Sequence, residues 1–534
     1  MRRRTRLAVR PAALAMLAAI LVAALPAPAA ADPDPSVATT DAGRVRGVVT
    51  GSYRLFQGIP FAAAPVGPRR FAPPAPVPPW SGARDARAPG NRCPQPAAIT
   101  GDPASDTEDC LYLNVTAPRS ASRHAPRPVL VWVHGGGLAN GAGSDYDARR
   151  LAVGGGIVVV TVNYRLGALG FLGLGALPGS GALGLQDQQA ALRWVRRNIA
   201  GFGGDPARVT LAGESAGAQS SCGQLVSPGA AGLFDRVILQ SNPCIKPGLD
   251  QSPSRPFVDL PVWLAPAEAD ARAMALAVEA GCAGTGTPPD TVVRCLRGLP
   301  VTTLLSIQFL ATPAYGNRVL PENPERVLGA GRFHRVPVLS GITRDEGTFL
   351  AALLTPGPIP ADQYRPFLDA RFGDDAAAVE GRYPLSAYRS TRHALAAIVS
   401  DREWAWPAQE TDDLFARRVP TFSYEFTDRR AAPLFEYPAD IPAGATHGAE
   451  LGYLFDRLGK PNDLDRAQRA LANRMIRYWA RFASTGDPNR PGLPRWPRYR
   501  HHGAAPHVQE LGPERTGAFD RSGEHLLRFW RDLG

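Results

Sequence analysis

The sequence contains no apolar run long enough to cross a membrane. Its longest such run covers residues 12–25, whereas a spanning helix needs roughly 18 or more apolar residues, so no stable membrane anchor is expected. The run follows five arginines, ends at Pro26 and is followed by small residues up to Ala31. This order predicts a secretory signal peptide over residues 1–31 and a protein secreted to the extracellular space. The general and twin-arginine export routes both stay open, because Arg6 stands where the twin-arginine signal usually has an aromatic residue.

A clustered basic stripe is also missing. The formal net charge is +11, but five arginines lie before the first acidic residue, Asp32, which leaves +6 for the rest of the chain. That excess is scattered, and Arg193, Arg196 and Arg197 fit the solvated face of a helix. Nucleic-acid binding requires basic residues gathered on one surface. We therefore expect no nucleic-acid partner.

The sequence has no C-x-x-C pair and no Cys/His cluster, which argues against a zinc site. We expect no metal and no cofactor. The six cysteines instead form three pairs that are local in the sequence, which predicts disulfides closing short loops in an oxidising compartment. Free buried thiols are the alternative. The predicted pairs are Cys93 with Cys110, Cys222 with Cys244, and Cys282 with Cys295.

Linker-like Ser/Gly segments and acidic runs are absent as well, so residues 32–534 are predicted to form one large domain with insertions. Apolar strand-like runs alternate with helical patterns, which indicates an α/β fold whose sheet is covered on both faces and binds ligands at the carboxyl ends of its strands. The predicted strands are residues 129–133, 157–162, 209–212, 237–240, 336–340 and 421–426. The predicted helices are residues 185–198, 267–280, 291–296 and 467–483. Residues 43–50 and 53–58 alternate like a hairpin, and the proline-rich residues 71–80 fit a packed irregular crossover.

The chemistry centres on Gly213-Glu214-Ser215-Ala216-Gly217. A strand-like run ends at the first glycine and a helix-compatible run begins directly after the serine. Such a nucleophile elbow holds the serine on a strained turn with its hydroxyl exposed, and the glycines avoid collisions with the neighbouring strand and helix. The five-residue motif alone is weak support, but its flanking elements are those that the mechanism requires. Ser215 is therefore the candidate nucleophile.

A serine hydroxyl needs a neighbouring base, and that base needs an orienting carboxylate. Among nine histidines, His447 has the most suitable context, a loop far downstream of the serine. Glu346 follows a predicted strand and is the candidate acid, while Asp345 beside it stays a rival that spacing does not exclude. His134 belongs to a glycine loop. The C-terminal histidines are predicted to be exposed, namely His501, His502 and His507.

The glycine run after residues 129–133 suits a second task. The tetrahedral intermediate of acyl transfer carries an oxyanion, which backbone N–H groups stabilise where no side chain blocks the approach. Gly136, Gly137 and the N–H of Ala216 are the candidate donors. A glycine turn that merely ends the strand is the alternative.

Ordered motifs along nearly the whole mature chain resemble the type-B carboxylesterase family, of the cholinesterase and carboxylesterase lineage. They are FQGIPFAAAPVGPRRF, EDCLYLNV, HGGG, GESAGAQS, GITRDEG, THGAE and YWARFASTGDPN. The resemblance implies an α/β-hydrolase fold with a large, mostly parallel sheet, helices on both faces and an inserted helical layer. It also implies a triad of Ser215, Glu346 and His447, with Glu346 rather than Asp345 as the acid.

The family also pairs cysteines at positions matching Cys93 with Cys110 and Cys282 with Cys295. Cys222 with Cys244 is inferred instead from the expected proximity of the helix after the elbow and the end of the next strand. The loop between Cys93 and Cys110 has no aromatic residue, whereas cholinesterases carry a tryptophan there that binds quaternary ammonium. Choline esters are therefore not expected as dedicated substrates. The loop is also short and polar, which argues against large lipid aggregates.

We thus expect a secreted serine hydrolase that cleaves small carboxylic esters through an acyl-enzyme. The same machinery acting on a lactone, carbamate, polyester or toxin ester is the alternative, and a non-catalytic binding homologue is a further one. Residues 243–264, 304–315 and 404–406 would line the substrate pockets, but their side-chain directions, and hence the specificity, are not disclosed. Oligomeric state is also open. The near absence of lysine, with only Lys246 and Lys460, indicates a GC-rich bacterial genome.

Overall fold

The computed structural model describes residues 34–175, 177, 179–241, 243–245, 261–355, 357–501 and 506–533. Residues from Pro35 onward belong to one compact unit. The predicted signal peptide, residues 1–31, lies outside the described residues, so its boundary with the mature domain stays a prediction. No helix among the described residues is long and apolar enough to span a membrane.

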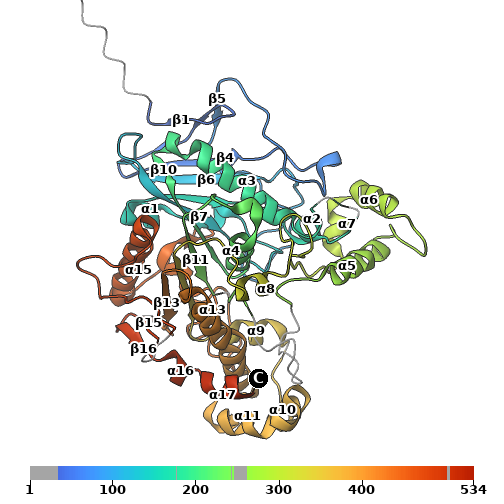
Figure 1. Cartoon of the computed structure of the whole chain (residues 1–534), viewed down its shortest axis with the longest axis vertical. Coiled ribbons are helices and arrows are strands. Elements are labelled where there is room, and N and C mark those ends of the chain that lie inside the picture. Colours follow the sequence, from blue (N-terminus) through green and yellow to red (C-terminus); the bar gives the residue numbers. More distant parts are fainter. Residues whose placement is uncertain are drawn as a thin grey trace, which may run out of the picture. The chain divides into compact units, whose positions relative to one another are not determined.

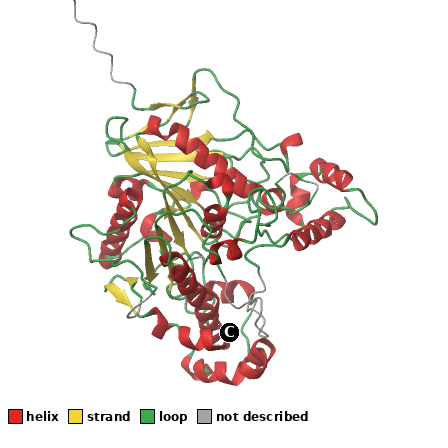
Figure 2. Cartoon of the chain, in the orientation of Figure 1, coloured by secondary structure: helices red, strands yellow, loops and turns green. Residues whose placement is uncertain are grey.

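A sheet of eleven strands runs through the described residues (Figure 2). Its middle strands, from β9 to β15, pair in parallel, and antiparallel strands flank them at both edges. The predicted α/β class is therefore confirmed. In spatial order the strands are β16 (Thr516–Phe519), β15 (Val508–Leu511), β13 (Thr421–Phe426), β12 (Val338–Thr343), β11 (Arg236–Gln240), β10 (Gly204–Glu214), β7 (Arg127–Val133), β9 (Val158–Val162), β6 (Tyr112–Pro118), β4 (Tyr53–Pro60) and β3 (Val48–Val49).

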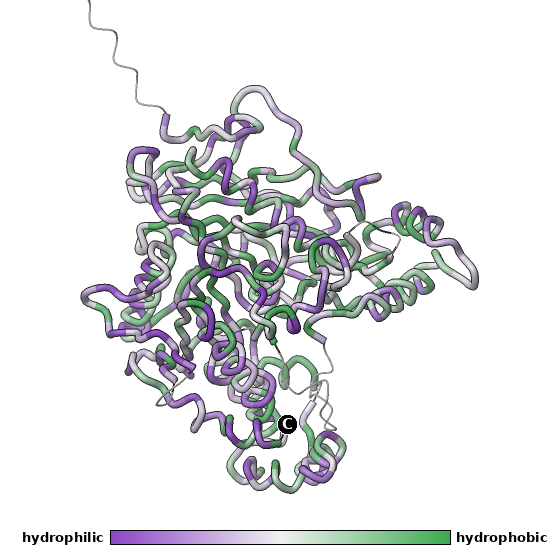
Figure 3. Tube along the Cα trace, in the orientation of Figure 1, coloured by the Kyte–Doolittle hydropathy of each residue, from purple (hydrophilic) through white to green (hydrophobic). Residues whose placement is uncertain are grey.

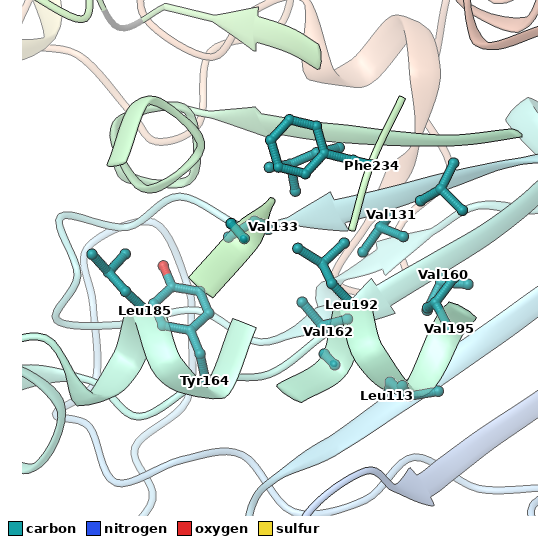
Figure 4. Packing of buried hydrophobic residues seen from close by; sticks show 14 of the residues in the cluster. Leu113, Val131, Val133, Val160, Val162, Tyr164, Leu185, Leu192, Val195 and Phe234 are labelled. Carbon is teal, nitrogen blue, oxygen red and sulfur yellow. The ribbon is translucent and has the colours of Figure 1, made fainter. Parts of the chain in front are cut away.

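Helices cover both faces of this sheet, so its parallel strands are apolar on both sides. Alternate side chains of β7 enter different cores. Val131 and Val133 join the core formed with α3 (Leu183–Asn198) and α4 (Ala216–Val226), while Trp132 joins the core formed with α1 (Arg149–Gly155) and α15 (Arg466–Thr485). Figure 1 shows these helices around the strands, and Figure 3 shows how apolar the strands are. In Figure 4, Leu185, Leu192 and Val195 of α3 lie beside valines of β7 and β9.

The predicted strands and helices are present, with ends that differ by a few residues. Of the predicted hairpin strand 43–50, only residues 48–49 pair with β4, antiparallel as predicted, because residues 44–46 pair instead with residues 37–39 and 83–85 in a separate small sheet. The proline-rich residues 71–80 form neither helix nor strand. The predicted inserted layer corresponds to α5 (Pro266–Glu279) and α6 (Pro289–Gly298), which share a small core with α2 (Gly167–Phe171) and α7 (Val301–Ser306).

The remaining elements, apart from the strand at residues 44–46, carry no prediction from the sequence. The helices among them are α8 (Pro324–Gly329), α9 (Gly347–Leu354), α10 (Tyr364–Phe372), α11 (Ala376–Arg382), α12 (Thr391–Val399), α13 (Trp406–Ala416), α14 (Leu451–Leu454), α16 (Arg521–Glu524) and α17 (Leu527–Leu533). Short strands form two small sheets outside the main one. They are β1 (Val37–Thr39), β2 (Arg44–Arg46) and β5 (Ala83–Asp85) in one, and β8 (Tyr146–Asp147) and β14 (Asp456–Arg457) in the other.

All three predicted disulfides are formed, which rules out free buried thiols for the six cysteines. The pairing of Cys222 with Cys244 confirms the expectation that α4 lies next to the end of β11. Disulfides of this kind are typical of proteins that fold in an oxidising compartment.

Candidate active site

Ser215 occupies the tight turn between β10 and α4. Its backbone has φ 55° and ψ −125°, a conformation that costs free energy for any residue with a side chain. The Ser215 N–H donates to the carbonyl of Gln240, 2.9 Å away at the end of β11. The turn also requires glycine on both sides, because a Cβ at Gly217 would lie 2.1 Å from the Val133 oxygen and one at Gly213 would lie 2.4 Å from the carbonyl carbon of Gly217. The predicted strand, turn and helix are therefore present.

The glycine loop leaves β7 at the same edge of the sheet. A Cβ at Gly135 would lie 3.1 Å from the Cβ of Ser215, so this loop packs directly on the elbow. Gly136 and Gly137 have φ of 102° and 61° and are exposed, a backbone path that favours glycine. Ala216 is the first residue of α4, and the first N–H groups of a helix have no partner within it. The three candidate donors thus belong to two segments in contact beside Ser215.

Glu346 and His447 lie 101 residues apart in the chain and form a hydrogen-bonded pair. Glu346 follows β12 and is fully buried. Its Oε1 accepts from the Thr343 N–H at 2.9 Å, and its Oε2 lies 2.6 Å from His447 Nδ1. His447 is buried as well, with 4% of its surface exposed. A carboxylate in this position fixes the tautomer of the ring and leaves Nε2 for chemistry.

Asp345, the rival left open by spacing, has different contacts. Its carboxylate accepts two hydrogen bonds of 3.0 Å from Arg429 and one of 2.8 Å from the Ala445 N–H. The Asp345 N–H donates in turn to the Ala445 carbonyl at 2.9 Å. Asp345 therefore ties the loop that carries His447 to the end of β12, while Glu346 is the member of the pair that is hydrogen-bonded to the imidazole.

Two aromatic rings pack on the imidazole of His447. Phe349 of α9 lies 5.1 Å away between ring centroids, and Trp404 lies 5.0 Å away. Trp404 belongs to a π-helical turn, Ser400–Ala405, a form that often occurs at functional sites. Residues 404–406 were among the predicted pocket segments. Phe349 was not predicted, although it lies one helical turn after Glu346.

Three buried carboxyl groups surround the His447 ring. Glu346 is hydrogen-bonded to Nδ1, and Oε1 of Glu214 lies 3.3 Å from Nε2. Glu450 accepts a 3.0 Å hydrogen bond from Gln240 nearby. Burial disfavours the imidazolium, but the negative charges of Glu346 and Glu214 outweigh burial and raise the pKa of His447 to about 9. Burial likewise raises the pKa of Glu214, and it raises that of Glu450 to about 8. The raised pKa values mean that this cluster of one histidine and three glutamates retains a proton at a higher pH than the same groups would in water.

A model of the carboxylesterase family matches residues 33–530. The chain belongs to the carboxylesterase family. Cocaine esterase of Oryctolagus cuniculus is 34% identical over 503 residues, which cover 87% of this chain and 90% of that protein. Acylcarnitine hydrolase of Rattus norvegicus is 33% identical over 533 residues, covering 93% and 90%. Carboxylesterase 3 of Pongo abelii is 33% identical over 551 residues, covering 93% and 91%. The chain is thus a type-B carboxylesterase, a hydrolase of carboxylic esters.

The other histidines of this carboxylesterase lie in different surroundings. His134 is fully buried and stacks on Tyr164 at 4.4 Å, and its Nδ1 lies 2.8 Å from the Gly135 carbonyl. Burial lowers the pKa of His134 to about 4. His501 and His507 are half-buried, so the prediction that they are exposed was wrong. Both contact neighbouring side chains, His501 with Asp413 at 3.2 Å and His507 with Gln509 at 2.9 Å. His502 lies outside the described residues.

Sequence reasoning missed Glu214 and Glu450 as site residues. Both stand inside motifs that were recognised, since Glu214 directly precedes Ser215 and Glu450 is three residues after His447. A carboxyl group next to a candidate nucleophile was a usable signal. Their burial beside the imidazole was not visible, because the strands and loops that carry them meet only in the folded chain.

Proposed function

We propose that this carboxylesterase is a secreted serine hydrolase that cleaves small carboxylic esters through an acyl-enzyme. Ser215 is the nucleophile, His447 the general base and Glu346 the acid that orients it. The observation that supports this best is the hydrogen-bonded pair of Glu346 and His447, with His447 Nε2 3.3 Å from Glu214, the residue directly before the strained Ser215 at the carboxyl edge of a parallel sheet.

The reaction proceeds in two halves. His447 Nε2 takes the proton of the Ser215 hydroxyl as Oγ bonds to the ester carbonyl carbon. The tetrahedral intermediate then expels the alcohol oxygen, which receives that proton from His447. In the second half His447 takes a proton from water, whose oxygen attacks the acyl carbon, and the acid leaves as the proton returns to Ser215. Glu346 stabilises the imidazolium in both halves.

The N–H groups of Gly136, Gly137 and Ala216 stabilise the negative oxygen that develops in each intermediate. The N-terminus of α4 adds its positive end to this region. Losing one such donor typically costs about 3 to 4 kcal/mol of transition-state stabilisation. The exposed, positive-φ path of the two glycines is the feature that supports this role.

The substrate class proposed here is the small carboxylic ester. The relatives named for cocaine and acylcarnitines support a common ester chemistry with varied acids and alcohols. A lactone, carbamate, polyester or toxin ester as the substrate of the same machinery stays the alternative. Secretion is supported by the N-terminal arginines with their apolar run and by the three disulfides. The strong preference for arginine over lysine supports a bacterial source, although the relatives named above are mammalian.

Replacement of the serine tests the mechanism. We expect Ser215→Ala to fold and to lose at least about a thousandfold in kcat on a short nitrophenyl ester. Ser220→Ala is the matched control, because Ser220 lies on the same helix and its buried hydroxyl has no hydrogen-bond partner among the described residues. A fluorophosphonate should label the natural protein and the control but not the Ser215 variant. Full turnover by Ser215→Ala would remove the serine from the mechanism.

A further inference from the structure

The glycine loop after β7 is held at its far end by the loop that the Cys93–Cys110 disulfide closes. The side chain of Gln95 forms two hydrogen bonds with Gly141 of the glycine loop. Its Oε1 accepts from the Gly141 N–H at 2.8 Å, and its Nε2 donates to the Gly141 carbonyl at 3.0 Å. Gln95 is 1% exposed, so these hydrogen bonds do not compete with bulk water.

Gln95 is itself fixed on the other side. Its backbone forms a two-hydrogen-bond bridge with Ser105, with distances of 2.8 and 2.9 Å. Its Nε2 also donates to the Cys93 carbonyl at 2.9 Å. Cys93, which stands two residues before Gln95 in the chain, is disulfide-bonded to Cys110. Hydrogen bonds at both ends of the amide therefore hold the Gln95 side chain in one conformation.

Close packing links Gly141 to the candidate oxyanion donors. The N–H of Asn140 donates to the Gly136 carbonyl at 3.1 Å, which closes a turn from Gly136 to Asn140. A Cβ at Gly136 would lie 2.2 Å from the Asn140 oxygen, and one at Gly141 would lie 2.5 Å from His134 Nδ1. Because Gly136, Asn140 and Gly141 are packed this closely, we expect a shift of Gly141 to move Gly136 as well.

The residues after Gly141 are held from the same side. The Ala142 N–H donates to Asp145 at 2.8 Å, and Asp145 is ion-paired with Arg92, three residues before Gln95. The Gly143 N–H donates to Asn163 at 2.8 Å. Within this group Gln95 is the side chain that contacts Gly141 directly, next to the turn that carries the donors.

We propose that Gln95 is a positioning residue for the oxyanion donors. It fixes Gly141 and, through the turn at Asn140, sets where the N–H groups of Gly136 and Gly137 point. This inference rests on the proposed function, in which those groups stabilise the negative oxygen. Preorganised donors act in the transition state more than in the bound ester, so their displacement lowers kcat with little change in KM.

Two variants test the inference in the full-length protein. Gln95→Met removes the two hydrogen bonds with Gly141 and the one to Cys93 at similar volume, and it should lower kcat about ten- to hundredfold while KM changes by less than about threefold. Gln95→Glu keeps an acceptor for the Gly141 N–H but places a buried carboxyl oxygen against the carbonyls of Gly141 and Cys93, so it should lose at least as much. A trifluoromethyl ketone, which adds to a serine hydroxyl to give a tetrahedral oxyanion, should bind each variant more weakly by the factor that kcat loses.

The number of folded sites is counted by end-point fluorophosphonate labelling, so that misfolded protein does not enter kcat. Gln468→Met is the matched control, because Gln468 is a buried glutamine that hydrogen-bonds Asp428 on the face of the sheet covered by α15. It should lose stability but keep kcat and ketone affinity. Gln95 variants with unchanged kcat and ketone affinity, or variants that fail to fold altogether, would assign Gln95 to stability alone and overturn the inference. Failure of the proposed function is distinct, because natural protein would then resist the fluorophosphonate and the ketone.

Discussion

The proton on His447 is the property of a single residue that most directly controls turnover. A general base must be neutral before it accepts the serine proton, whereas Glu346 and Glu214 stabilise the charged imidazolium and raise its pKa to about 9 from an ordinary 6.5. In the proposed mechanism the free enzyme therefore loses activity as the pH falls below the raised pKa of His447. Glu346 orients the imidazole in this mechanism, so Glu214 is the neighbouring negative charge that can be removed without changing that orientation.

We expect kcat/KM to rise with pH and to reach half its maximum well above pH 6.5. In Glu214→Gln the midpoint should move to lower pH, because one negative charge 3.3 Å from Nε2 no longer stabilises the imidazolium. Initial rates on a short nitrophenyl ester between pH 5 and pH 10 measure both profiles. A flat profile, or a Glu214→Gln midpoint displaced toward higher pH, would contradict the assignment of His447 as the base.

Residues that carry chemistry could be predicted where a short motif defines them. Ser215 was proposed from a five-residue motif together with its flanking strand and helix, which the structure contains, and the glycine loop from its position after an apolar strand. The choice between Glu346 and Asp345 could not be made from spacing, since both follow β12 and both have polar partners in the fold. It depends on which carboxyl group faces a loop about a hundred residues away.

At the scale of elements, the site depends on how closely α4 approaches β7. Glycine at position 217 allows the first turn of α4 to touch the backbone of Val133, where the glycine loop begins. A methyl group there has no free space. The elbow and the glycine loop should therefore both shift when one carbon is added at position 217.

We expect Gly217→Ala to destabilise the protein by about 1 to 3 kcal/mol and to lower kcat, because its Cβ would lie 2.1 Å from the Val133 oxygen. Gly381→Ala in α11 is the control. Nothing lies within 4 Å of its added Cβ, so this change should be neutral or stabilise by up to about 1 kcal/mol. Urea unfolding and ester turnover measure the two effects. An unaffected Gly217→Ala would show that the helix can move away freely.

Elements were predictable where burial is purely apolar. Residues 129–133 form a continuous apolar run and residues 158–162 a run interrupted only by Thr161, and both are parallel strands. β6 has no such signal, because its buried Asn114 hydrogen-bonds Thr161 across the sheet at 3.1 Å. α13 is hidden similarly, since its buried Asp412 is ion-paired with Arg521. Polar residues satisfied by distant partners look like surface in the sequence.

At the scale of the whole molecule, a second buried charge cluster joins the C-terminal helices to the sheet. His525 lies between two carboxylates, with Nδ1 2.5 Å from Asp401 and Nε2 2.8 Å from Glu425 of β13. Burial disfavours the imidazolium, but these carboxylates raise the pKa of His525 to about 10. Because Asp401 lies in the π-helical turn that carries Trp404, this cluster also supports the aromatic ring that packs on His447 in the candidate active site.

The sign of the pH effect follows from the two states. The folded protein holds the His525 proton up to about pH 10, whereas the unfolded chain releases it near pH 6.5. The stabilisation is therefore complete below pH 6.5 and is lost as the pH rises toward 10. His525→Gln should lower the free energy of unfolding by about 3 to 5 kcal/mol at pH 6 and by much less at pH 9.5. Urea unfolding at several pH values measures this difference, with His124→Gln as a control because His124 is exposed. If the loss in free energy of unfolding of His525→Gln stayed constant with pH, His525 would stabilise the fold by packing rather than by its charge.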